Sequence, residues 1–347
     1  MDSVSQFVLG AACAVAVMGR RTAVWKAALA GGVAGTLPDL DVFIDHGDAI
    51  ANMTMHRANS HSLFWLTLAA PLAGGLVAWL ARQRALWRRW SVALGLALVT
   101  HPLLDAMTVY GTQLLQPFSE HPFAVGSIFI IDPLYTLPLL AGLIGELAVR
   151  APRRALRWNA AGLLLSTAYL GWSVAAQQWA REQALAALPD RGAGRAVLVT
   201  PAPFNTLLWR VVAMRPDGYD EGYVSLLDRR AAGEPIRFVF QPTGTARLAP
   251  ALDTLPSFQR MAWFSRGFYA VDERPSQRAG GAPRAVLSDL RMGQAPHFVF
   301  AFEIAERGAD GRWQAVVARN IGGRGDLSTA WPWLWRRALG QPLPPPG

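Results

Sequence analysis

The sequence predicts a mainly α-helical membrane bundle over residues 1–185, followed by a smaller β-rich soluble domain over residues 196–341. Three observations predict this division. The 347-residue chain is 52% hydrophobic and only 16% charged, which is unusually apolar for a soluble protein. Residues 63–180 consist of long apolar stretches separated by arginine clusters. Beyond about residue 190 the sequence becomes mixed and polar, with many Pro and Gly residues.

The first elements in the chain are two short apolar runs, Phe7–Gly19 and Ala23–Leu37. Each falls short of, or only just approaches, the 17–25 residues that a membrane-spanning helix needs. We expect them to form a helical hairpin packed against the bundle. Asp2 stands where a cleaved signal would carry basic residues, so no cleaved signal is expected.

Longer apolar stretches predict the membrane-spanning helices. Leu63–Ala81, Ser91–Val109 and Ile128–Val149 each have a length close to that of a span. A fourth stretch, Trp158–Trp179, contains interspersed Ser, Thr and Gln residues. We expect this helix to face the bundle as much as the lipid.

The loops between these helices alternate in charge. One set collects most of the basic residues of this half, namely Arg20, Arg21, Lys26, Arg82, Arg84, Arg88, Arg89, Arg150, Arg153, Arg154 and Arg157. The other set, residues 38–62 and 110–127, contains only Arg57 as a fixed positive charge. The positive-inside rule therefore places the arginine loops in the bacterial cytoplasm, and the other loops and the C-terminal domain on the periplasmic side of the inner membrane. This topology also accounts for the net charge of +9, so no nucleic-acid partner is expected.

The C-terminal half predicts a series of strands separated by turn signals such as Arg215–Gly218. The β-rich runs are Leu207–Met214, Tyr223–Leu227, Met261–Val271, Phe298–Ile304 and Trp313–Val317. The single cysteine, Cys13, excludes an intrachain disulfide and a cysteine-based zinc site. We expect it to be a small core residue.

Two aspartates follow the second apolar run. Asp39 and Asp41 come directly after Pro38 and lie two residues apart. Such carboxylates can converge on one cation, or one can bind while the other orients a histidine. An ordinary helix-terminating turn is the alternative, since Pro-Asp is common turn chemistry.

Two histidines lie at the mouth of the first long span. His56 and His61 are five residues apart, so a loop or helix-start geometry is needed to bring them together. Neutral imidazole is the commonest zinc ligand, and Arg57 between them could meet an anionic substrate such as a phosphate. An interfacial polar loop is the alternative.

A third polar pair lies inside the second long span. His101 and Asp105 are four residues apart and share one helix face. We expect Pro102 to interrupt and bend the helix there. The pair could bind a metal, or could be a buried hydrogen-bonded couple that fixes helix packing.

Together, these motifs predict one metal site whose ligands are Asp39, Asp41, His56, His61, His101 and Asp105. Mixed imidazole and carboxylate ligands suit zinc, and manganese or magnesium become favoured as carboxylates outnumber histidines. Four ligands make a mononuclear site, and six allow a dinuclear one. We assign catalytic roles to Asp41, Asp105 and Arg57, because an aspartate without a metal can act as a general base.

The same motifs resemble a known family. Gly35–Asp41, His56–Ser62 and His101–Asp105, with Tyr110–Gln113 and Phe129–Pro138 after them, look like the YdjM-like inner-membrane family of metal-dependent hydrolases, whose name-giving member is LexA-regulated. The resemblance covers about residues 1–180. It implies an inner-membrane location and a relation to zinc-dependent phospholipase C.

One departure from the family pattern concerns the N-terminus. Many members carry a histidine there, whereas this chain has Gln6 in the matching region. The resemblance then implies a site with one ligand fewer, or a glutamine that contacts the substrate.

The expected function is a membrane-embedded metal-dependent hydrolase that acts on a phosphoester or lipid-like substrate at the outer face of the cytoplasmic membrane. Membrane lipid is the expected partner. The alternative is a non-enzymatic membrane protein with a structural metal or polar cluster and a partner-binding β domain. A transporter would need paired broken helices, and only Pro102 predicts a break.

Overall fold

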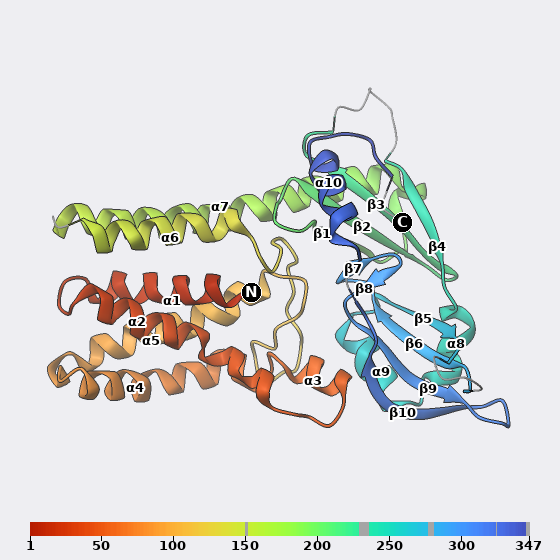
Figure 1. The fold of residues 1–347 in the computed structure, drawn as a ribbon, viewed down its shortest axis with the longest axis horizontal. Helices are drawn as coiled ribbons and strands as arrows, with labels where there is room; N and C mark the ends of the chain where they lie inside the picture. The colour runs from red at the N-terminus through yellow and green to blue at the C-terminus, as the bar shows by residue number, and fades with distance from the viewer. Residues whose placement is uncertain (150–151, 229–235, 277–280, 324, 345–347) are drawn as a thin grey trace. The chain divides into compact units, whose positions relative to one another are not determined.

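The computed structural model describes residues 1–149, 152–228, 236–276, 281–323 and 325–344. The chain forms two compact units (Figure 1). The helical unit contains Met1–Ile44, His56–Ala175 and Pro203–Asn205, and the β-rich unit contains Asp45–Met55, Ala176–Ala202 and Thr206–Gly347. The predicted order, helices first and sheets later, is confirmed. The predicted boundaries at residues 185 and 196 stay predictions, and Arg150 lies outside the described residues.

The helical unit is built from apolar helices that follow the predicted stretches closely. They are α1 (Ser3–Met18), α2 (Val24–Thr36), α4 (Leu63–Leu80), α5 (Trp87–Ala106), α6 (Pro133–Ala148) and the first part of α7 (Pro152–Ala187). Helix α1 packs against α2, α5 and α6, and α4 packs against α5. Asp2 caps α1 by accepting hydrogen bonds from the backbone N–H groups of Val4 and Ser5.

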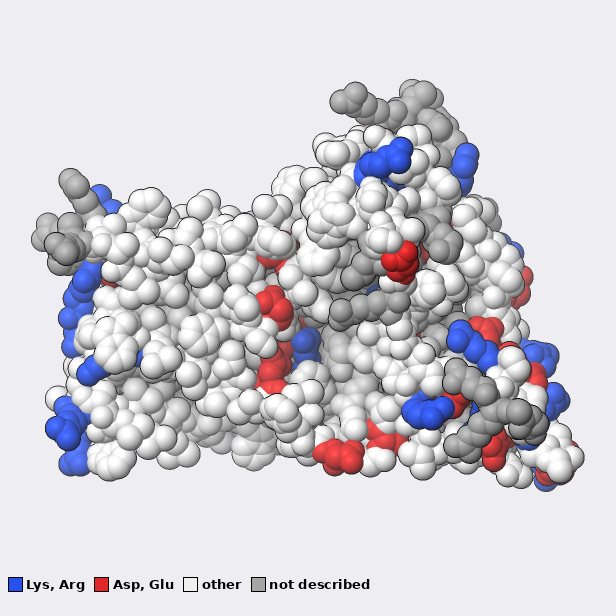
Figure 2. Space-filling model, viewed as in Figure 1, with Lys and Arg blue, Asp and Glu red and all other residues white. Residues whose placement is uncertain are grey.

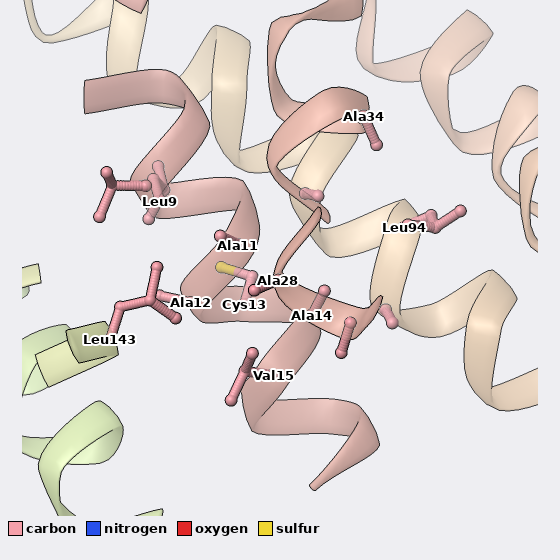
Figure 3. Packing of buried hydrophobic residues seen from close by; sticks show 14 of the residues in the cluster. Leu9, Ala11, Ala12, Cys13, Ala14, Val15, Ala28, Ala34, Leu94 and Leu143 are labelled. Atoms are coloured by element: carbon pink, nitrogen blue, oxygen red, sulfur yellow. The ribbon is translucent and has the colours of Figure 1, made fainter. Parts of the chain in front are cut away.

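Small residues allow α1 and α2 to approach closely. A side chain at Gly35 would come within 2.7 Å of the Gln6 carbonyl oxygen, so this contact requires glycine. Figure 3 shows the alanine-rich core that results, with Cys13 buried among its neighbours. The close approach brings Gln6, near the start of α1, beside the end of α2.

Helix α5 differs from the prediction at Pro102. It runs without a break from Trp87 to Ala106. Proline has no backbone N–H, so one carbonyl in the preceding turn loses its helical hydrogen bond. Leu98 and Leu104 on either side are buried in the core, and this packing holds the helix together across the proline. The predicted interruption is therefore wrong, the predicted bend stays a prediction, and His101 and Asp105 lie on one continuous helix.

Among the described residues, one helix is both long and apolar enough to cross a bilayer alone. It is α4, with a mean hydropathy of 1.8. Helices α1 and α6 are apolar but shorter. The multi-pass arrangement of the bundle therefore stays a prediction.

The β-rich unit contains two four-stranded antiparallel sheets, with strand orders β1-β2-β3-β4 and β10-β9-β6-β5. The strands are β1 (Val197–Pro201), β2 (Leu208–Arg215), β3 (Gly218–Ser225), β4 (Phe238–Pro242), β5 (Tyr269–Arg274), β6 (Arg284–Asp289), β9 (Ala301–Arg307) and β10 (Trp313–Asn320), with a small pair of β7 (Gly293–Gln294) and β8 (His297–Phe298). The helices are α3 (Ala49–Met55), the last part of α7 from Ala176 on, α8 (Thr245–Leu252), α9 (Pro256–Phe264) and α10 (Leu327–Ala338).

The predicted strand Met261–Val271 is wrong over its first half. Helix α9 occupies Pro256–Phe264, and β5 begins only at Tyr269. Phe258, Met261 and Phe264 recur at helical spacing and are all buried, and a proline begins the helix. The aromatic content of the run favoured a strand, but the spacing of its apolar residues is helical.

Helix α3 belongs to the β-rich unit, although it lies early in the sequence. It packs against α9 and β10, and its Thr54 hydroxyl accepts a hydrogen bond from Arg260. The segment that joins the two aspartates to the two histidines of the predicted site therefore packs in the β-rich unit.

Candidate metal centre

Three segments of the helical unit carry the side chains of the candidate site. Asp39 lies in the 3-10 helix η1 (Leu37–Phe43), which continues from α2 through Pro38. His61 ends the short 3-10 helix η2 (Asn59–His61), just before α4 begins. His101 and Asp105 lie one turn apart on α5. The end of α2, the start of α4 and the C-terminal part of α5 thus meet at one place.

Four ligand atoms converge there, one each from Asp39, His61, His101 and Asp105, and all lie within 4.8 Å of one another. The His61 Nε2 atom is 3.3 Å from Asp39 Oδ1 and 3.3 Å from Asp105 Oδ2. The His101 Nε2 atom is 3.4 Å and 3.5 Å from the same two oxygens. The two Nε2 atoms are 3.0 Å apart. Five of the six separations therefore lie between 3.0 and 3.5 Å.

These five separations are close to those between the ligands of a tetrahedral metal site. Zinc binds histidine nitrogen and carboxylate oxygen at about 2.0–2.1 Å, and the ligands of such a tetrahedron stand roughly 3.3–3.4 Å apart. Two imidazoles and two carboxylates are also a ligand set that zinc accepts. The residues present therefore fit a divalent cation.

The hydrogen bonds of the two imidazoles turn their lone pairs toward this centre. His101 Nδ1 lies 2.6 Å from the carbonyl oxygen of Gly35, which can only accept, so Nδ1 carries the proton. The Ser60 hydroxyl donates to the Asp41 carboxylate and must accept from His61 Nδ1, 2.9 Å away. In the neutral form of both rings, each Nε2 is then an acceptor.

Acceptor atoms thus face one another without a hydrogen between them. Asp39 Oδ1 and Asp105 Oδ2 are buried and have no hydrogen-bond donor among the described residues. One added proton can bridge two of the four atoms, whereas a metal cation can satisfy all four. Buried acceptors without partners are costly, so their convergence indicates a cation site.

Burial and charge shape the protonation of this group. The side chains of His61 and Asp105 are fully buried, and that of Asp39 is 21% exposed. Burial raises the pKa of Asp39, but the adjacent imidazoles of His101 and His61 lower it by more, so this pKa is well below its usual range. Burial lowers the pKa of His61, but the adjacent carboxylates of Asp105 and Asp39 raise it above its ordinary value. The carboxylates that attract a proton to His61 would equally attract a metal cation.

Asp41 and His56 lie outside the group of four atoms and contact each other. His56 Nδ1 is 2.6 Å from Asp41 Oδ1. Asp41 Oδ2 accepts from the Arg57 backbone N–H at 3.0 Å and from the Ser60 hydroxyl, which links it to His61. Burial raises the pKa of Asp41, but the hydrogen bonds from His56 and Ser60 outweigh it, so the pKa lies below its ordinary value. This carboxylate orients the His61 imidazole, an arrangement typical of metal-binding histidines.

Arg57 lies beside the same group. Its Nε is 3.1 Å from Asp105 Oδ2, its Nη1 is 3.4 Å from the Thr108 hydroxyl, and its guanidinium stands over the Tyr110 ring. Its backbone has a φ of 66°, in the left-handed region that costs energy for a residue with a side chain. The hydrogen bond from its N–H to Asp41 holds this conformation. The guanidinium is buried, so it acts on Asp105 rather than as an open anion site.

The structure brings together Asp39, His61, His101 and Asp105 of the six predicted ligands, and the ligand roles of all six stay predictions. Sequence reasoning did not assign a role in the site to Ser60, whose hydroxyl links Asp41 to His61. It also missed the carbonyl of Gly35, which orients His101. A contact made by the backbone does not depend on the residue type, so the sequence does not reveal it. Gln6 donates to Asp105 Oδ1 at 2.9 Å, and the Met1 amino group contacts the same oxygen.

Comparisons with known proteins identify the family to which the helical part of the chain is similar. The family model of the YdjM inner membrane protein matches residues 1–180, which is about half of the chain and includes every residue of the candidate site. An uncharacterized protein of Bacillus subtilis (strain 168), YfhP, is 33% identical over 132 residues, covering 35% of this chain and 36% of that protein. No solved structure matches the chain. On the extent of the family match, the chain belongs to the YdjM inner membrane protein family.

Proposed function

We propose that this protein is a membrane-embedded, metal-dependent hydrolase that acts on a phosphoester, with a lipid-like molecule as the favoured substrate. The observation that carries the proposal is the convergence of four acceptor atoms at tetrahedral spacing. Zinc is the proposed metal, because histidine nitrogen contributes half of the ligand set. Manganese or magnesium are the alternatives that a metal analysis would distinguish.

The surface of the helical unit supports a membrane setting. Many large apolar side chains of its helices are exposed, among them Leu29, Val33, Leu68, Leu72, Leu76, Val92, Leu96, Leu134, Leu137, Ile144, Leu164 and Leu165. Lys and Arg gather at one end of this unit in Figure 2, where α1 joins α2 and α4 joins α5. An apolar surface of this extent bounded by basic residues is typical of a bundle surrounded by lipid. We propose that the basic end faces the cytoplasm.

The segment that carries Asp39 also exposes apolar side chains. In and just after η1, Leu40, Val42, Phe43 and Ile44 are exposed, and Phe43 reaches 83%. Exposed aromatic and aliphatic side chains at the end of an apolar helix are suited to the headgroup region of a bilayer. This supports a site that opens at the membrane surface, where a lipid-like phosphoester would be within reach.

The side chains divide the chemistry among them. Asp39, His61, His101 and Asp105 would hold the metal, which when bound polarises a phosphoryl oxygen and lowers the pKa of water. Asp41 orients His61 through Ser60. Arg57 places a positive charge against Asp105 and so offsets part of the negative charge that a phosphoester would meet. Asp39 is the most exposed of the four and marks the side from which substrate would approach.

Burial of the other three ligands favours a second candidate, a structural metal that fixes the helices in a protein without enzymatic activity. His61, His101 and Asp105 each expose 1% or less of their surface. A structural metal is enclosed by protein ligands, whereas a catalytic one keeps a position open to water or substrate. In that case the β-rich unit would carry the function by binding a partner.

The test uses the full-length protein purified in detergent. We expect about one zinc per chain by elemental analysis, and hydrolysis of a phosphodiester reporter or of phospholipid in mixed micelles. His101→Ala should abolish both, while His121→Ala, which changes an exposed histidine of the helical unit, should change neither. Absence of stoichiometric metal, together with failure to bind added zinc or manganese, would contradict the proposal. Metal without hydrolysis would favour the structural role.

The proposed topology has a separate test. A periplasm-specific reporter fused after Gly347 should be active, because the basic loops are assigned to the cytoplasm and the C-terminal part to the opposite side. If a cytoplasm-specific reporter at the same position is active instead, the proposed orientation is overturned. The proposed metal site would not be affected by that result.

A further inference from the structure

Gln6 touches the candidate site without belonging to the four converging atoms. It lies in the first turns of α1, with 1% of its surface exposed. Its Nε2 donates to Asp105 Oδ1 at 2.9 Å and to the carbonyl oxygen of His101 at 3.2 Å. One amide group therefore bridges two residues of α5 that both contribute ligand atoms.

The chemistry of these two contacts requires a group with two hydrogens. A carboxylate oxygen and a carbonyl oxygen can only accept, so the NH₂ end of the amide must face them. A glutamate has no donor when ionised, and a neutral imidazole nitrogen carries one hydrogen at most. Glutamine is therefore suited to this position.

The other end of the amide strengthens the argument. Gln6 Oε1 is buried and has no hydrogen-bond donor among the described residues. Leaving an acceptor unsatisfied costs about 1–3 kcal/mol, so packing alone does not account for a buried glutamine here. The hydrogen bonds that the NH₂ group donates to Asp105 and His101 offset this cost.

Asp105 offers its two oxygens to different partners. Oδ1 contacts Gln6 and the amino group of Met1, while Oδ2 faces His61, His101 and the Nε atom of Arg57. Without the partners that contact Oδ1, the Asp105 carboxylate could rotate and turn both of its oxygens toward a cation. The hydrogen bond from Gln6 opposes this rotation.

We infer that Gln6 is a positioning residue that holds Asp105 so that the single oxygen Oδ2 faces the other three ligand atoms. This rests on the proposed function, because it assumes that the four atoms bind a metal. In this role Gln6 neither replaces a metal ligand that the site lacks nor contacts the substrate. A carboxylate that binds through one oxygen leaves room for water or substrate, which a catalytic site needs.

The test replaces the amide with an apolar side chain of similar length, Gln6→Met, in the full-length protein in detergent. Cobalt is the probe, because its visible spectrum reports the number and arrangement of its ligands. We expect the variant to bind cobalt and zinc about 10–100-fold more weakly, as for other groups that orient metal ligands. We also expect the cobalt absorption to weaken and shift, since a second oxygen of Asp105 would raise the coordination number.

Two further variants complete the design. Ser5→Ala is the matched control, because Ser5 is buried on the same helix but bonds to Asp2 and Thr136 instead of Asp105. It should leave affinity and spectrum unchanged. Gln6→Asn keeps the amide but withdraws it by about one carbon–carbon bond of roughly 1.5 Å. It should give a smaller loss of affinity, and it preserves the test if Gln6→Met fails to fold.

The outcomes separate this inference from the proposed function. If the wild-type protein binds metal and both Gln6 variants match it in affinity and cobalt spectrum, the positioning role is overturned and the metal site stands. If the wild-type protein binds neither zinc nor cobalt, the proposed function itself fails. A loss of affinity in Ser5→Ala equal to that in Gln6→Met would also overturn the inference, because disturbance of α1 would then explain both.

Discussion

The two units of this protein differ in how completely their buried polar groups are paired. In the β-rich unit each buried cation faces a carboxylate: Arg210 Nε lies 2.5 Å from Glu221, Arg291 lies 2.7 Å from Asp289, and Arg337 contacts Asp228. In the helical unit, the buried Arg57 also contacts a carboxylate, that of Asp105. The two carboxylate oxygens of Asp39 and Asp105, however, each lie 3.3–3.5 Å from two imidazole nitrogens that are acceptors in their neutral form. The first pattern pairs each buried cation with a carboxylate of the same unit, whereas the second leaves acceptor atoms that a bound cation could satisfy.

This difference teaches how to separate structural from functional polar groups. A buried ion pair marks a place where removal of one partner is costly, but it needs no ligand. A buried cluster of acceptors lacks a partner within the chain, so it is a candidate site for a ligand that supplies positive charge. The three predictions below test this comparison, from the largest expected effect to the smallest.

The largest effect is expected in the β-rich unit. Glu221→Ala leaves Arg210 buried without its carboxylate, and breaking such a pair costs about 3–5 kcal/mol of unfolding free energy. Hydrogen exchange of peptides from β2 and β3, followed by mass spectrometry, should show the loss. Glu273→Ala is the control, because Glu273 pairs at the surface with Arg247 and Arg307 and should cost less than about 1 kcal/mol. Metal affinity should be unchanged in both, and a large change in Glu221→Ala would remove the distinction between the units.

An intermediate effect is expected when the metal is removed from the helical unit. A ligand at 100 times its dissociation constant stabilises the folded state by about 2.7 kcal/mol, and chelation withdraws this contribution. Exchange should accelerate in peptides from η1, η2 and the end of α5, which carry the four acceptor atoms. Peptides from β2 and β3 should not respond. Equal acceleration in both units, or none in either, would argue against a cation in the helical unit.

The smallest effect is expected from the group that orients His61. Ser60→Ala removes the hydroxyl between Asp41 and His61 Nδ1 but keeps all four converging atoms. Zinc affinity, measured by competition with a chelator, should fall about 10–100-fold. Ser62→Ala is the control, since Ser62 lies two residues away but caps α4 and donates to the Gln116 carbonyl instead of contacting Asp41 or His61. An equal loss of affinity in the control would mean that the hydroxyl of Ser60 has no specific role.

Much of the helical unit could be predicted from local patterns. Apolar length predicted α4 to within one residue, and the spacing of His101 and Asp105 predicted a shared helix face. The β-rich unit was harder, because aromatic residues occur in both strands and amphipathic helices. The run at Met261 therefore predicted a strand where α9 forms.

The candidate site shows where local patterns stop. His56 and His61 have the same chemistry and flank the same loop, so spacing could not tell which would turn toward His101. The answer depends on Asp41, which accepts from His56 directly and reaches His61 only through Ser60. Gln6 and Asp105 are 99 residues apart, and no pattern in the sequence joins them.

The sequence by itself determined which side chains were available to bind a cation and that they would lie at the ends of apolar helices. This follows because helix periodicity, charge alternation and the scarcity of polar residues in apolar segments are local properties of the chain. Only the tertiary structure decided which ligand atoms meet. It also decided that Asp41 orients His61, while Asp39 and Asp105 face the candidate metal site. Those choices depend on helices packed through glycines and on hydrogen bonds between distant residues, and they exist only once the chain has folded.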